Sequence, residues 1–237
     1  KSHPGEYNSL RFKQLTRLRG LFMLRRTDSE MIMLDHVTRP LVDPLLNKMA
    51  ATLHRSKVRA DQVTFVAFIA GLLAMILIAL GQPLLGLALF ALNRILDGLD
   101  GALARCGRPT MAGGYLDIVF DFIIYAGVVF SFALFDESFA LVAAFVIFSF
   151  IGTGSSFLAM AIFADRVQLA PATPQPKSFY FLGGLTEGTE TLLFIAAICL
   201  MPDFFNLFGV IFGLMCCLTT YTRIHQSYHT LKAAEAQ

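Results

Sequence analysis

Four aspartates lie among apolar residues between Asn93 and Asp121 of this 237-residue chain. Asp97 and Asp100 are three residues apart, and Asp117 and Asp121 are four apart. At these spacings the two members of each pair share one face of a helix. A carboxylate in an apolar setting is costly to maintain, which makes each of these residues a functional candidate. Two facing helices would bring all four carboxylates to one point, where their charges repel one another.

A bound divalent cation would offset this repulsion. Oxygen-only ligands suit Mg²⁺, Mn²⁺ or Ca²⁺ rather than zinc. The residues between and beside the pairs fit a phosphate ligand, because glycine permits close backbone approach and arginine offers forked donors. They are Gly98, Gly101, Arg105, Arg108, Gly113 and Gly114. The alternative is a polar loop with helix-capping aspartates, but Asp97, Asp117 and Asp121 lie inside apolar runs and not at their ends.

The order of these residues resembles the signature of a known family, the class I CDP-alcohol phosphotransferases. The pattern is Asp97-x-x-Asp100-Gly101-x-x-Ala104-Arg105, followed by Gly113-x-x-x-Asp117-x-x-x-Asp121. The stretch between Arg105 and Gly113 is shorter here than is usual in the family. The resemblance implies a bacterial integral membrane protein of phospholipid synthesis that moves a phosphatidyl group to an alcohol.

The resemblance also implies ligands and roles. The donor would be CDP-diacylglycerol or another CDP-linked lipid, with CMP as leaving group, and two Mg²⁺ or Mn²⁺ ions would assist. Asp97, Asp100 and Asp117 would bind metal, and Asp121 would act as general base and also contact the second metal. A homodimer in a lipid bilayer, with no nucleic-acid partner, is expected. The residues expected along the nucleotide and diphosphate are Asp61, Thr64, Gly101, Ala104, Arg105 and Gly113.

Asp61 and Thr64 match the family only in part. Asp61 could contact the nucleotide, or it could be the N-cap of the first long apolar helix, and both interpretations remain open.

The resemblance also implies a small alcohol as acceptor, with or without a phosphate of its own. Arg108 and Arg223 would suit a phosphorylated polyol, whereas Glu187 and Glu190 would suit a cationic or hydroxyl-rich acceptor. Three of these four residues also have a plainer interpretation. The two glutamates are typical first-turn residues favoured by the helix dipole, and Arg223 is typical of a side chain reaching from a helix end toward water.

Composition predicts the elements that position these residues. The chain is 56% hydrophobic and contains 23 Phe, which indicates an all-α membrane protein. Six apolar runs can each reach the length of a bilayer crossing, about 20 residues. They are 63–81, 83–105, 114–135, 139–164, 181–201 and 204–226. We therefore expect a six-helix catalytic domain over 61–230 and a short tail over 231–237.

Residues 1–60 are expected to form an arm at the membrane surface. Within it, 10–26 mixes leucines with basic residues, as in an interfacial amphipathic helix, although a solvated basic tail fits equally well. A second surface helix is predicted within 31–55, from apolar residues at helical spacing.

The basic residues predict the orientation. Twelve of the 19 Lys and Arg lie at or before Arg59, whereas the breaks at 81–83, 136–138 and 202–203 carry none. By the positive-inside rule, both termini and the aspartate cluster face the cytoplasm of a bacterial inner membrane.

Two other classes of protein remain open. A divalent-cation transporter would also hold intramembrane carboxylates, but it leaves the Gly-x-x-Ala-Arg segment after Asp100 unexplained. A catalytically silent CDP-binding scaffold would result if the short loop had removed the nucleotide pocket. Neither a transporter nor a silent scaffold would release CMP, whereas the enzyme would.

Overall fold

The computed structural model describes residues 35–56, 58–107, 109–166, 186 and 188–235, and within these ranges the chain is helical with no strand. The predicted helix at 10–26 lies outside the described residues. Short 3₁₀ turns, η1 (Glu137–Phe139) and η3 (Pro202–Phe204), precede α6 and α8. The α-helices are α2 (Asp35–Arg55), α3 (Ala60–Ala79), α4 (Pro83–Cys106), α5 (Met111–Phe135), α6 (Ala140–Arg166), α7 (Gly188–Leu200) and α8 (Phe205–Glu235).

Each predicted apolar run corresponds to one of the helices α3 to α8. Four segments of the described chain are long and apolar enough to cross a membrane: α3, α5, η1 with α6, and η3 with α8. Of the other two, α4 carries the charged residues of the site and α7 has 13 residues. The count of six crossings and the orientation of the termini stay predictions. The last run was predicted too short, because α8 continues through polar residues to Glu235.

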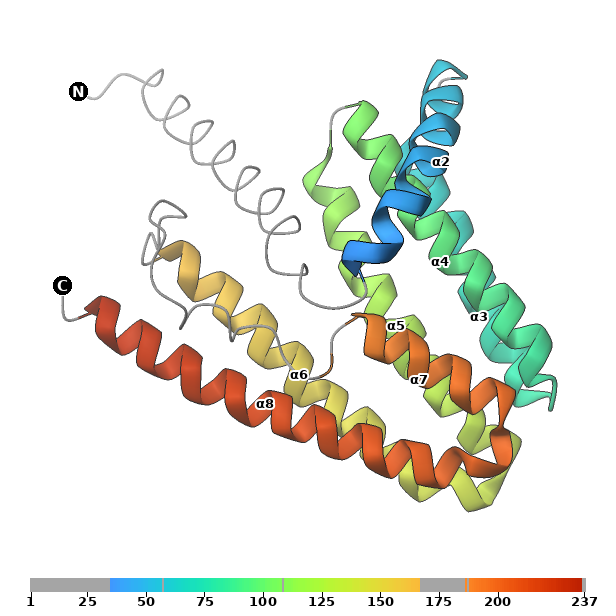
Figure 1. Ribbon diagram of the computed structural model, residues 1–237, viewed down its shortest axis with the longest axis vertical. Coiled ribbons are helices and arrows are strands. Elements are labelled where there is room, and N and C mark those ends of the chain that lie inside the picture. Colours follow the sequence, from blue (N-terminus) through green and yellow to red (C-terminus); the bar gives the residue numbers. More distant parts are fainter. Residues whose placement is uncertain (1–34, 57, 108, 167–185, 187, 236–237) are drawn as a thin grey trace, which may run out of the picture.

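The helices form two groups joined by α5 (Figure 1). On one side α3 packs against α4 and α5, and α2 packs against α4. On the other side α6 and α8 run side by side, and α7 contacts both α4 and α8. The acid pairs lie on α4 and α5, within the first group.

The predicted breaks coincide with tight turns. Gly81 has a φ of 77°, a conformation open to glycine, just before Pro83 begins α4. At the next break the side chain of Asp136 accepts a hydrogen bond from the Ser138 backbone at 2.8 Å. Short turns of this kind make consecutive helices antiparallel neighbours, which is how α4 comes to lie beside α3.

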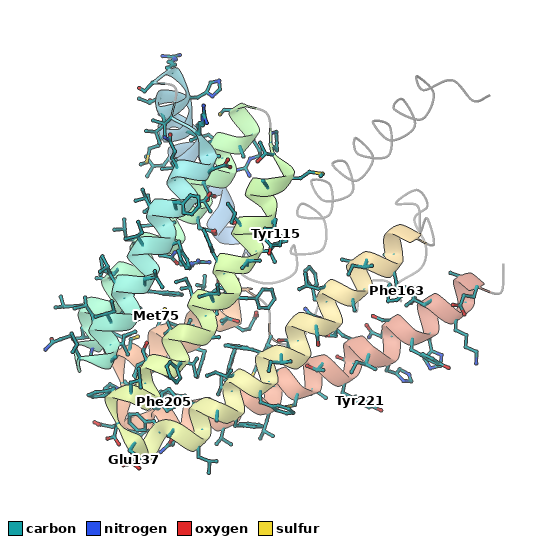
Figure 2. The ribbon with its side chains drawn as sticks, turned by 180° about the vertical axis from the view of Figure 1, so that it is seen from behind. Met75, Tyr115, Glu137, Phe163, Phe205 and Tyr221 are labelled. Carbon is teal, nitrogen blue, oxygen red and sulfur yellow. The ribbon has the colours of Figure 1, made fainter. Side chains whose placement is uncertain are left out.

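Small residues allow the helices to approach closely. Gly71 on α3 lies against Ile124 of α5, and Met75, labelled in Figure 2, lies over Gly127 of α5. Between α6 and α8, an added Cβ at Gly152 would lie 2.8 Å from the hydroxyl of Thr220. Small residues on α3, α5 and α6 therefore serve close helix packing.

The main core takes buried side chains from all of α3 to α8, and stacked aromatic rings join α5, α7 and α8 within it. Phe132 of α5 stacks on Phe205 of α8 with ring centroids 4.9 Å apart, and Phe194 stacks on Phe212 at 4.2 Å. Other large apolar side chains face outward. Phe163 on α6 and Tyr221 on α8 project from the outer surface (Figure 2). An outer surface this apolar suits contact with lipid.

A second, smaller core fixes the rotation of α4. Leu46 and Ala50 of α2 are buried against Leu99 and Leu103 of α4. The helix thus turns one face to α2 and leaves Asp97 on another. The helix predicted within 31–55 is confirmed as α2, and its place at the membrane surface stays a prediction.

Candidate metal and nucleotide site

Three of the four aspartates meet between α4 and α5. Asp97, Asp100 and Asp117 each offer a carboxylate oxygen, and these oxygens lie within 4.8 Å of one another. Asp100 is buried, with 5% of its surface exposed, whereas Asp97 and Asp117 are half-buried. Three carboxylates so close together suit an oxygen-preferring divalent cation such as Mg²⁺ or Mn²⁺. The predicted convergence of the two helical pairs is therefore found for three members.

Thr64 on α3 contacts this cluster directly. Its hydroxyl lies 2.5 Å from Oδ2 of Asp100 and donates a hydrogen bond to it, and both residues are buried. A donor of this kind fixes the orientation of a metal-binding carboxylate. Thr64 was predicted to face the nucleotide; in the structure it holds Asp100, and contact with a nucleotide stays a prediction.

Asp121 lines the same pocket but does not belong to this group of three. Its Oδ1 accepts a hydrogen bond from Nη2 of Arg94 at 2.7 Å, in an ion pair between α5 and α4. Arg94 also approaches Oδ2 of Asp97 at 3.7 Å. Asp121 is not one of the three grouped carboxylates, and its roles as base and metal ligand stay predictions.

Sequence reasoning missed Arg94 and its supports Asn93 and Tyr125 as parts of the site. Arg94 donates to the Tyr125 hydroxyl and to the Asn93 side chain, each at 2.8 Å. Their spacing from the aspartates along the helices could have indicated that they belong to the site. Arg94 precedes Asp97 by three residues, and Tyr125 follows Asp121 by four, so both continue the faces that carry the acids.

A pocket opens beside these side chains. Its lining comes from α3, α4 and α5, and it combines acids with the stacked rings of Phe68 and Phe120, whose centroids are 3.9 Å apart. It is lined by Thr64, Ala67, Phe68, Asn93, Arg94, Asp97, Asp117, Phe120 and Asp121. Acidic, basic and aromatic side chains from three helices therefore line one small cavity.

Asp61 is not the N-cap of α3. Arg59 is the N-cap, and its backbone N–H donates to the side chain of Gln62 at 3.0 Å, so Asp61 lies in the first turn. There it faces Gly113 near the start of α5, where an added Cβ would lie 2.7 Å from Oδ1 of Asp61. The fold thus brings together Asp61 and Gly113, two predicted nucleotide-binding residues that are far apart in the sequence.

The remaining nucleotide candidates lie on the last turns of α4. Gly101 and Ala104 are half-buried, and Arg105 is exposed in the final turn. Thr110 begins α5 as its N-cap and accepts a hydrogen bond from the Gly113 backbone at 3.0 Å. The helix therefore starts earlier than the predicted residue 114, and the connection between α4 and α5 is short.

Two of the four acceptor candidates, Arg223 and Glu190, lie within the part of the chain that the structure describes. Arg223 on α8 donates to the carbonyl oxygen of Thr153 on α6 at 3.3 Å and lies over the ring of Phe157. Glu190 is half-buried in the first turn of α7. Arg108 and Glu187 lie outside the described residues. A role for any of the four in acceptor binding stays a prediction.

The family model for CDP-alcohol phosphatidyltransferase matches residues 57–222. This range includes all of the α3, α4 and α5 residues described above. The chain belongs to the CDP-alcohol phosphatidyltransferase family, a family of membrane transferases.

Individual relatives agree with this assignment. The chain is 48% identical to the inner membrane protein YnjF of Escherichia coli over 206 residues, covering 86% of this chain and all of that protein. It is 35% identical to archaetidylinositol phosphate synthase of Pyrococcus horikoshii over 97 residues, 40% of this chain and 52% of that one.

A solved structure shares the fold. Phosphatidylinositol phosphate synthase of Mycobacterium tuberculosis, with CDP-DAG bound, superimposes with a TM-score of 0.58 at 19% identity. The match covers 78% of this chain and 94% of that one.

Proposed function

We propose that this protein transfers a phosphatidyl group from CDP-diacylglycerol to the hydroxyl of a small alcohol and releases CMP. The observation that carries the proposal is the meeting of Asp97, Asp100 and Asp117 within 4.8 Å, beside a pocket that also contains Asp121. Family membership supports a CDP-linked donor, as does the CDP-DAG bound to the M. tuberculosis enzyme of the same fold.

The acidic triad fits a divalent cation by its chemistry, since it offers three carboxylate oxygens and no sulfur or nitrogen ligand. Asp97, Asp100 and Asp117 would hold Mg²⁺ or Mn²⁺, which would neutralise the charge that develops on a departing diphosphate oxygen. Thr64 keeps Asp100 oriented for this purpose.

Asp121 is the proposed general base. It takes the proton of the acceptor hydroxyl while the hydroxyl oxygen bonds to the lipid-side phosphorus. The bond from that phosphorus to the bridging oxygen breaks, and CMP leaves with that oxygen. Gly101, Ala104 and Arg105 would lie along the nucleotide, at the last turns of α4. Asp61 and Gly113 would close the pocket at the start of α5.

A phosphorylated polyol such as inositol phosphate is the proposed acceptor. The similarity to archaetidylinositol phosphate synthases of two archaea supports it. Arg223 is the residue proposed to contact the phosphate of the acceptor. Residues 61–230 would form the catalytic domain of a homodimer in the bacterial inner membrane, with the site facing the cytoplasm. The likeness to an E. coli inner membrane protein supports this location.

The test is CMP release by the purified protein in detergent. CDP-diacylglycerol and Mg²⁺ or Mn²⁺ are supplied with a panel of alcohols: inositol phosphate, glycerol phosphate, inositol and serine. Release with one acceptor, absent in Asp121→Asn, would support the proposal and identify that acceptor. CDP binding without release for every acceptor would favour a silent scaffold, and metal flux in vesicles without release would favour a transporter.

A further inference from the structure

Arg94 is held on three sides by hydrogen bonds. Nε donates to Asn93, Nη1 to the Tyr125 hydroxyl and Nη2 to Asp121, at 2.8, 2.8 and 2.7 Å. Asn93 is fixed in turn, because its Nδ2 donates to the carbonyl oxygen of Ala67 on α3 at 2.8 Å. The guanidinium is thus anchored to all three helices around the pocket.

Aromatic packing further restricts this side chain. The guanidinium carbon lies 4.9 Å from the centroid of the Tyr125 ring and 5.7 Å from that of Phe90, within the range of cation–π attraction. The side chain of Arg94 is 14% exposed. An arginine keeps its charge under all ordinary conditions. The pocket therefore contains a fixed positive charge between α4 and α5.

The position of this charge bears on how many cations the acids bind. Arg94 lies 2.7 Å from Asp121 and 3.7 Å from Asp97, so it is shared by the two acid pairs. Among the described residues that line the pocket it is the basic one. A second divalent ion between Asp121 and Asp97 would meet the guanidinium at short range, where like charges repel strongly.

We propose that Arg94 takes the place of a second divalent ion. On this view the triad Asp97, Asp100 and Asp117 binds one ion, and Arg94 is a positioning residue that holds Asp121 beside it. The inference rests on the proposed function, which assigns the metal to the triad. It also revises the number of ions expected from the family resemblance from two to one.

The experiment counts Mn²⁺ bound to the full chain in detergent. Electron paramagnetic resonance detects free Mn²⁺ during titration with the metal alone, so the number bound per chain follows at saturation. We expect one ion for the wild type and for Arg94→Lys, which keeps the charge. We expect two for Arg94→Gln. The matched control is Arg55→Gln, which removes an exposed arginine at the end of α2 and should bind one ion.

The other possible counts would overturn the inference, alone or together with the proposed function. Two ions in the wild type would overturn the inference and leave the proposed function standing. No ion in the wild type would overturn both, because the triad would then not be a metal site. One ion in a folded Arg94→Gln, judged by gel filtration, would show that Arg94 does not exclude a second ion. If Arg94→Gln does not fold, Arg94→Met removes the same charge in its place, and two ions in the wild type would still overturn the inference.

Discussion

The hydroxyl of Thr64 donates a hydrogen bond to Asp100 across the interface between α3 and α4, at 2.5 Å. The carbonyl oxygen of Ala60, within the same helix, lies 3.1 Å from this hydroxyl and shares its one proton with Asp100. A residue near the start of one helix thereby orients a buried carboxylate of the next. This relationship makes Thr64 a part of the site even though it is not an acid.

Replacing Thr64 by Val should weaken Mn²⁺ binding at the triad by about 10- to 100-fold, as is typical when the partner of a metal ligand is lost. Valine has a similar shape but no hydroxyl, so Asp100 loses its donor. Isothermal titration with Mn²⁺ measures the affinity. Thr64→Ser retains the hydroxyl and should bind nearly as the wild type does; equal affinity in the Val and Ser variants would contradict the prediction.

Asp121→Asn should separate catalysis from metal binding. We expect CMP release to fall by about 10²- to 10⁴-fold, the usual contribution of a general base. Mn²⁺ affinity should change little, because the triad is intact. Asp117→Asn is the comparison, and it should lose both. The assignment fails if Asp121→Asn turns over at the wild-type rate.

Gly113→Ala should impair CDP binding. The added Cβ would lie 2.7 Å from Oδ1 of Asp61 and 2.9 Å from the Thr110 hydroxyl, so one of these polar groups must move. The adjacent Gly114 is the matched control, because a Cβ there meets nothing within 4 Å. Equilibrium binding of CDP in the presence of Mg²⁺ measures the difference.

The Gly114→Ala variant should bind as the wild type does. A double variant, Asp61→Ala with Gly113→Ala, tests whether Asp61 causes the clash. Part of the binding lost in Gly113→Ala should return if Asp61 contributes only by its bulk. A further loss would show that Asp61 itself contacts the nucleotide.

Thr219→Val should destabilise the packing of α8. Both the backbone N–H and the hydroxyl of Thr186 donate to the Thr219 hydroxyl, at 3.1 and 2.9 Å, and both residues are buried. Buried groups left without a partner cost about 1–3 kcal/mol in the free energy of unfolding. Thermal unfolding in detergent should show a lower Tm than for Thr219→Ser, and identical values would contradict the prediction.

Much of this protein follows from local patterns in its sequence. Apolar run lengths predicted the helices α3 to α8, because a helix in lipid must satisfy its backbone internally over a length set by the bilayer. The spacing of Asp97 with Asp100, and of Asp117 with Asp121, predicted that each pair shares a helix face. These properties depend on neighbours along the chain and need no knowledge of packing.

The tertiary structure decided which of the four acids meet. Three converge, while Asp121 faces Arg94, and this depends on how α4 and α5 are rotated against each other by the contacts of α2 and α3. The pairing of Asp61 with Gly113 was equally inaccessible, because it joins helix starts 52 positions apart in the sequence. Helical period determines which residues share a face, but only packing determines what that face meets.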